Sequence, residues 1–127
     1  MKTFIAALII FAVLCTLVCN VSSYIKEQTG LLSELAEALP ESTEAFRNDK
    51  EVAQKTKELC ALWAQSMVVF PYIMGYDMLD RADEAALSLA AAAETKSEED
   101  FLAARLRFID AIGRLSGLFA LTAESIF

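Results

Sequence analysis

The stretch FIAALIIFAVLCTLVCNV, residues 4–21, decides how this chain is organised. It contains no charged residue, and only Thr16 and Asn20 within it are clearly polar. A helix rises about 1.5 Å per residue, so this run would span about 27 Å, close to the hydrocarbon thickness of a bilayer. We therefore predict a transmembrane helix, with membrane-spanning side chains that include Phe4, Ile5, Leu8, Ile9, Ile10, Phe11, Leu14, Leu17 and Val21.

The alternative to an anchor is a signal sequence that is removed. Val21 and Ser23 fit the small-residue positions of a cleavage site, and cleavage there would secrete a chain beginning at Tyr24. The apolar run is long for a signal sequence, which favours retention. We assign residues 1–23 as an N-terminal transmembrane anchor, equivalent to an uncleaved signal, and residues 24–127 as a separate helical domain.

The charges that flank the apolar run predict its orientation. The α-amino group and Lys2 precede the run, whereas Glu27 offsets Lys26 after it. By the positive-inside rule the N-terminus stays in the cytoplasm. We therefore expect a single-pass protein of the cell membrane whose C-terminal domain is extracytoplasmic.

Composition restricts the function of residues 24–127. The chain has 11 Lys and Arg against 18 Asp and Glu, and only Lys2 precedes this domain, which therefore carries −8. Such a charge disfavours nucleic acid as a partner. The chain has no histidine, the commonest general base and metal ligand. We predict no enzyme activity and no cofactor; chemistry by carboxylates alone is the alternative.

The spacing of apolar residues predicts an all-α fold. After the transmembrane helix we expect an up-and-down bundle of about three or four helices, because apolar residues recur at three- and four-residue steps. Prolines and glycines mark the breaks. The expected helices cover residues 24–39, 48 or 49 to 70, 77–93 and 98–123.

Residues 59–76 allow a second interpretation because they carry no charge. They could form a second membrane span, although Gln65, Ser66, Pro71 and Gly75 argue against it.

Two groups of residues are candidates for helix contacts or a pocket. Gly113 and Gly117 form a G-x-x-x-G spacing, which favours internal packing beside Leu79 and Gly75 and leaves a dimer face as the alternative. The aromatic residues Trp63, Phe70, Tyr72 and Tyr76 lie near one expected end of the bundle. Core packing is the favoured role, and a ligand pocket or contact with the membrane interface is the alternative.

Acidic and thiol groups offer weaker candidates. Asp77, Asp80 and Glu84 share a helix face with Asp83 beside them, and three carboxylates could meet a calcium ion. A solvated acidic first turn is the favoured interpretation. Cys60 is expected to be a buried small residue.

Five short features carry a family resemblance: the Lys2-led apolar start, Asn48-Asp49-Lys50 ahead of Trp63, Leu79-Asp80, Lys96-Ser97-Glu98-Glu99, and the close Glu124-Ser125-Ile126-Phe127. Over nearly its whole length the chain resembles an uncharacterised family of small bacterial single-pass membrane proteins with a helical domain of unknown function. The resemblance implies a membrane helix that runs into a helical hairpin region, and it carries over no catalytic residue. The central stretch 70–76 is more apolar here than in that family.

These observations predict a non-enzymatic, membrane-anchored helical interaction or accessory protein. Its expected partners are the membrane and either another integral membrane protein or a second copy of the chain. The alternative is a helical bundle at the cell envelope that senses a small ligand through its aromatic end.

Overall fold

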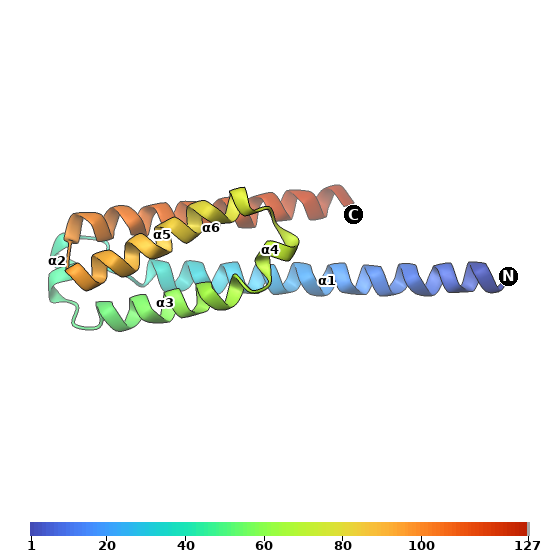
Figure 1. Ribbon diagram of the computed structural model, residues 1–127, viewed down its shortest axis with the longest axis horizontal. Helices are drawn as coiled ribbons and strands as arrows, with labels where there is room; N and C mark the ends of the chain where they lie inside the picture. The colour runs from blue at the N-terminus through green and yellow to red at the C-terminus, as the bar shows by residue number, and fades with distance from the viewer. Residues whose placement is uncertain (127) are drawn as a thin grey trace.

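The computed structural model describes the backbone of residues 1–126 and the side chains of residues 1–117. Within this part every regular element is a helix, which confirms the predicted all-α class (Figure 1). The helices are α1 (Lys2–Glu37), α2 (Thr43–Asn48), α3 (Val52–Ser66), α4 (Phe70–Ile73), α5 (Tyr76–Thr95) and α6 (Glu98–Ile126).

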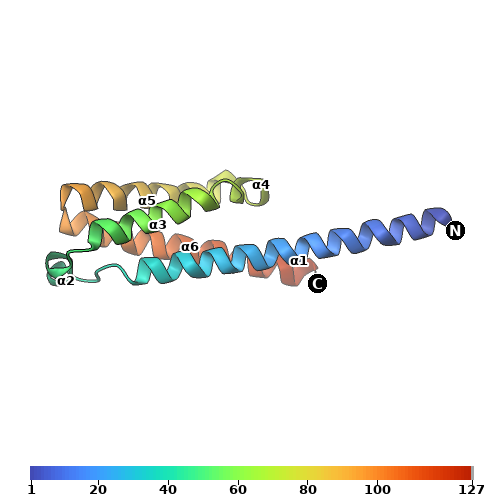
Figure 2. The same cartoon turned by 90° about the horizontal axis from the view of Figure 1, so that it is seen from below.

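Helix α1 combines the predicted transmembrane segment and the first predicted helix of the bundle in one unbroken rod. Its N-terminal half projects alone beyond the other helices (Figures 1 and 2). Phe4 is 69% exposed there, whereas Ile25 is only 1% exposed. Among the described residues α1 is the one helix long and apolar enough to cross a membrane, and its apolar window is unburied. This is consistent with a signal anchor or a signal sequence.

The C-terminal half of α1 packs with α3, α5 and α6, and neighbouring helices run in opposite directions (Figures 1 and 2). The Oγ of Ser66 near the end of α3 donates to Gln28 Oε1 at 3.2 Å. The guanidinium of Arg105 on α6 donates to the backbone oxygen of Ala36 at 3.1 Å. These two contacts fix the register of α1 against its neighbours.

The core follows the predicted apolar stripes of the four long helices. Each fully buried leucine or phenylalanine contributes about 1.5–3 kcal/mol relative to an exposed one. Leu31 departs from its predicted stripe and is 40% exposed. The side chains that are almost fully buried include Leu32, Leu59, Leu79, Leu89, Phe101, Phe108, Ile112 and Leu115.

The connection after α1 contains the short helix α2. The Oγ of Ser42 accepts a hydrogen bond from the Ala45 backbone N–H, which caps α2. Phe46 on α2 packs against Phe101, with ring centroids 4.9 Å apart. The predicted start of the next helix at Asn48 or Asp49 is wrong, because Asn48 ends α2 and α3 begins at Val52. The cap at Ser42 thus favours a separate short helix, and the longer helix α3 begins only after it.

The chain turns back between α3 and α5, so the alternative of a second membrane span through residues 59–76 is wrong. Helix α3 ends at Ser66, and α4 is a single turn with Pro71 in its first turn. Proline is tolerated there because the N–H it lacks would have had no partner within the helix. We call residues 67–76 the elbow, and the end of the bundle that holds it the proximal end. The opposite end, with α2 and the turn from α5 to α6, is the distal end.

We expect Phe108→Ala to lower the free energy of unfolding by about 3–5 kcal/mol, since it removes a fully buried ring and leaves a cavity. Leu106→Ala is the matched control, because Leu106 lies two residues away and is 63% exposed; its effect should stay within about 0.5 kcal/mol. Thermal unfolding of the full chain in mild detergent, followed by circular dichroism, measures both. Equal losses would contradict the assignment of Phe108 to the core.

Candidate functional site

The predicted aromatic group divides into two core residues, Trp63 and Phe70, and two surface residues, Tyr72 and Tyr76. Trp63 is 3% exposed, and its indole Nε1–H donates to Asp83 Oδ1 at 3.0 Å. Its ring meets Phe70 and Phe108 edge to face, at centroid distances of 6.2 Å and 5.8 Å. Core packing of Trp63 is therefore confirmed, and a ligand pocket around this ring is wrong.

Tyr72 and Tyr76 lie on the elbow and point into solvent. They are 90% and 66% exposed, and Val68 beside them is 68% exposed. Neither tyrosine lines any of the cavities described below. They are therefore surface residues, and their contact with the membrane interface stays a prediction.

The glycine pair on α6 does not serve packing inside this chain. Gly113 and Gly117 are exposed, and a Cβ atom built on either meets no heavy atom within 4 Å. The expectation of close packing beside Leu79 and Gly75 is therefore wrong, because the pair faces away from the core. A dimer face along this side of α6 stays a prediction.

The acidic cluster at the start of α5 does not converge. Asp83 turns inward to accept the hydrogen bond from Trp63, whereas Asp77, Asp80 and Glu84 are exposed. Among the described residues no three potential ligand side chains come together for a metal ion. Here one carboxylate positions an indole and the others are solvated.

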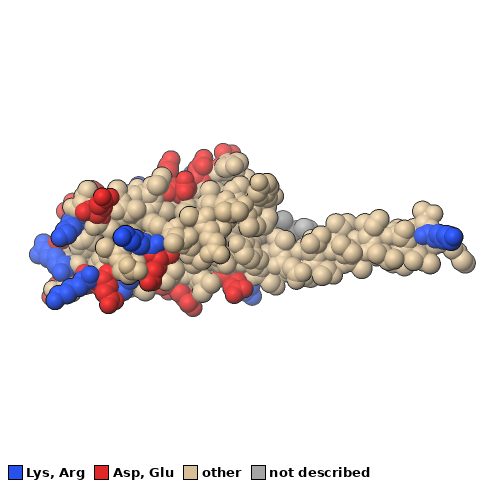
Figure 3. All heavy atoms as spheres, turned by 60° about the horizontal axis from the view of Figure 1, so that its bottom comes forward, with Lys and Arg blue, Asp and Glu red and all other residues tan. Residues whose placement is uncertain are grey.

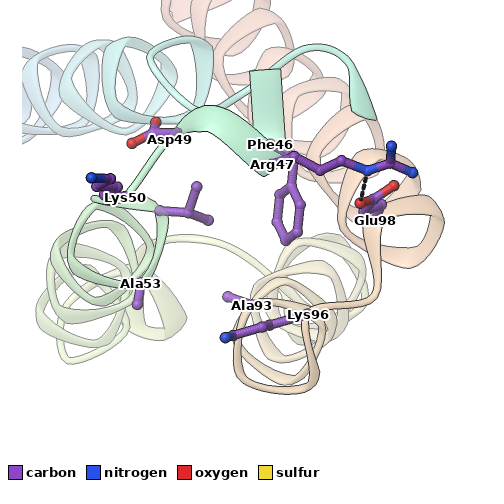
Figure 4. A pocket seen from close by; sticks show the side chains of 9 residues that line it. Phe46, Arg47, Asp49, Lys50, Ala53, Ala93, Lys96 and Glu98 are labelled. Atoms are coloured by element: carbon purple, nitrogen blue, oxygen red, sulfur yellow. Dashed lines mark hydrogen bonds and ion pairs between the residues drawn. The ribbon is translucent and has the colours of Figure 1, made fainter. Parts of the chain in front are cut away.

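The distal end contains a groove that the sequence did not reveal. One cavity of about 500 Å³ lies where α2 covers the ends of α3 and α5 (Figure 4). A second cavity of about 460 Å³ shares Ala53 and Ala93 with the first and continues along α3 and α5 to Cys60. We call the two together the distal groove, lined by Phe46, Arg47, Asp49, Lys50, Val52, Ala53, Thr56, Lys57, Cys60, Ala90, Ala93, Glu94, Lys96 and Glu98.

Thr56 in this groove is a buried polar group without a partner. Its side-chain oxygen is inaccessible and makes no hydrogen bond within the described part of the chain. Other helical threonines satisfy theirs: Thr29 donates to the Ile25 oxygen at 2.8 Å, and Thr95 to the Ala91 oxygen at 2.9 Å. An unmade hydrogen bond of this kind costs about 1–3 kcal/mol. Thr56 therefore leaves an unmade hydrogen bond beneath the groove.

Charged groups line the mouth of the groove. Arg47 turns toward Glu98, whose hydrogen bond raises the pKa of the Arg47 guanidinium (Figure 4). The ammonium of Lys55 lies 2.9 Å from Asp49 Oδ2, and this hydrogen bond lowers the pKa of the Asp49 carboxyl. A space-filling view shows basic groups gathered at this end and acidic groups along the flanks (Figure 3).

Two lysines at the mouth of the groove are not neutralised by an ion pair with a described residue. Lys50 and Lys96 form no ion pair with any described residue. The side chain of Lys96 points from the end of α5 toward the side on which α3 lies (Figure 4). With the alanines of the floor, they suit an elongated apolar group that ends in an acid.

Cys60 lies at the inner end of the groove and is less buried than the sequence predicted. It is half-buried, and its Sγ lies 3.7 Å from the Ala86 backbone oxygen. Burial raises the pKa of the Cys60 thiol, because the thiolate would lose hydration. The thiol is thus protonated at neutral pH and is a poor nucleophile.

Arg105 links α1 to the rest of the bundle, and sequence reasoning missed it. It is 7% exposed, and it donates to the backbone oxygens of Ala36 at 3.1 Å and Glu37 at 3.4 Å. These carbonyls belong to the last turn of α1, where oxygens lack helical partners. A cation there also complements the negative end of the helix dipole.

We expect Arg105→Met to lower the free energy of unfolding by about 1.5–3 kcal/mol, the range for charged hydrogen bonds, because it removes the buried guanidinium bonds to the Ala36 and Glu37 oxygens. Arg107→Met is the matched control, since Arg107 is exposed and bonds only to its own helix, at the Ala103 oxygen. Thermal unfolding in mild detergent compares them, and indistinguishable melting curves would refute the role given to Arg105.

Comparison of the chain with protein-family models, with curated proteins and with solved structures finds no match.

Proposed function

We propose that this chain is a non-enzymatic, membrane-anchored helical interaction protein. The observation that carries the proposal is the contrast along α1. Its N-terminal half is apolar and unburied, and it continues without a break into a half that packs in the bundle. An apolar surface this large is unfavourable in water, so a lipid environment is its expected setting.

The anchor defines where the bundle would sit. With Lys2 on the cytoplasmic side, the bundle lies outside the cell membrane with its proximal end toward the lipid. From Tyr24 to Glu37 the helix rises about 20 Å, so the distal groove would face away from the bilayer at about that height. The family resemblance implies the same layout.

A binding role fits the chemistry of the described residues better than catalysis. The sequence has no histidine, and the thiol of Cys60 is held protonated. The distal groove offers recognition instead, through lysines at its mouth and an alanine floor. We infer that the bundle holds this groove toward an extracytoplasmic part of another integral membrane protein.

The first test places the chain in intact cells with a C-terminal tag. We expect the full-length mass in the membrane fraction after an alkaline wash, because the apolar half of α1 stays in lipid. Crosslinking in cells, mild solubilisation and mass spectrometry should then identify a membrane protein in near-equal amount. Lys50→Glu with Lys96→Glu should reduce its capture, whereas Lys57→Glu, farther along the groove, should reduce it less.

Two results would contradict the proposal. A soluble chain that begins near Tyr24 would show that the segment is a removed signal sequence and that the protein is secreted. Recovery of the tagged chain alone, with the same crosslinked species in the double variant, would contradict the proposed membrane-protein partner.

The second candidate function is a bundle that senses a small ligand, and the unpartnered hydroxyl of Thr56 favours it. The site would be the distal groove and not the aromatic end. Native mass spectrometry of the full chain should detect a bound small molecule that Ala53→Phe removes, since the ring would fill the groove shared by both cavities. Ala64→Phe, on an exposed position of α3 that lines neither cavity, is the control. An adduct that survives Ala53→Phe, or no adduct, would refute this function.

A further inference from the structure

The elbow lies level with the end of the apolar run of α1. Tyr24 stands three residues after Val21, and its ring meets Phe70 of α4 edge to face at 6.3 Å. One helical turn farther along, Gln28 accepts the hydrogen bond from Ser66 at the end of α3. The chain therefore passes from α3 to α4 at the depth where the transmembrane run ends. Figures 1 and 2 show α4 beside this part of α1.

Along the elbow, side chains buried in the core alternate with side chains exposed to solvent. Phe70 and Met74 are buried and hold the turn on the core, whereas Val68, Tyr72 and Tyr76 are exposed. All three exposed side chains belong to the elbow, and two of them are tyrosines, which combine an apolar ring with a hydroxyl group. Tyrosine is enriched where membrane meets water, because its ring enters the acyl boundary while its hydroxyl stays hydrated.

Charge around the elbow follows the same boundary. Residues 59–76 contain no charged group, and the first charge after them is Asp77, in the opening turn of α5. On α1 the first charges after the apolar run are Lys26 and Glu27. Among the residues whose side chains the structure describes, the uncharged band of α1 thus extends onto the proximal end, with charges beginning just beyond it (Figure 3).

We propose that the elbow inserts Val68, Tyr72 and Tyr76 into the headgroup region of the bilayer that holds α1. The proposal rests on the membrane anchoring proposed above. Lipid is the occupant because the elbow lies level with the end of the unburied apolar run of α1. A zwitterionic lipid suits it, since the acidic domain would be repelled by an anionic surface. The bundle then stands on the membrane at two points, α1 and the elbow, which fixes its tilt.

The test uses the full chain in phosphatidylcholine vesicles and in matching vesicles whose phosphatidylcholine carries bromine on its acyl chains. Tyr72→Trp and Val68→Trp each add an indole at the elbow. Leu87→Trp is the matched control, because Leu87 is as exposed as Tyr76 and lies about 16 Å farther along α5. The native chain supplies the background emission of Trp63, and circular dichroism checks that each variant keeps its helices.

We expect brominated lipid to quench the added emission at positions 68 and 72 at least about twofold more than at 87, and aqueous acrylamide to show the reverse order. Since these vesicles contain no other protein, such quenching needs no protein partner. Equal quenching at the three positions, in vesicles that still carry the chain on flotation, would overturn the elbow proposal and leave the anchoring intact. Failure of the native chain to float with the vesicles would overturn the anchoring itself, and the elbow proposal with it.

Discussion

The unbroken backbone of α1 is the constraint on which the rest of the structure depends. One helix serves both as the apolar segment and as a core helix of the bundle, so no flexible linker separates the two. Proline is absent from the helix, and its first interruption comes after Glu37, ahead of Pro40. Because helical register passes directly from one half to the other, the position of the anchor determines the orientation of α3, α5 and α6. Arg105 of α6 binds the C-terminal end of α1, and Ser66 of α3 binds Gln28 nearer its middle. The buried half of α1 is therefore held at both of its ends.

The long helices could be predicted because their signal is local. Apolar residues at helical spacing, acids in the first turn of α6 and breaks at Pro40 and Gly75 are all readable along a single segment. The short elements could not, because tertiary contacts decide them. Phe46 reaches Phe101 across the bundle and stabilises α2, and Phe70 packs on Tyr24 and starts α4 four residues after α3 ends. The outward direction of Gly113 and Gly117 depends in the same way on which side of α6 the larger residues occupy.

The candidate site was the least predictable part, for a geometric reason. The distal groove is formed by α2, α3, α5 and the start of α6. No pattern within a single segment of the sequence predicts it. Lys50 and Lys96 are ordinary surface lysines in sequence, and they line the same cavity only because α3 begins and α5 ends at the same end of the bundle. Thr56 looks like a helix-interior threonine, and only the packing shows that its hydroxyl is buried without a partner. Trp63 stood out in the sequence as a rare residue and proved to be core.

The continuous helix α1 and the distal groove at the other end of the bundle together affect how a partner would bind. A bundle held by α1 alone could rotate about that helix and tilt on the bilayer, and its distal groove would sweep a wide range of heights and directions. The proposed contact of the elbow with lipid would remove most of this freedom, because the elbow lies to one side of the α1 axis (Figures 1 and 2). Orientation costs entropy when a partner binds, and a bundle already held upright has lost part of that entropy beforehand. The exposed aromatic residues at the proximal end would therefore strengthen recognition at the distal end without touching the partner.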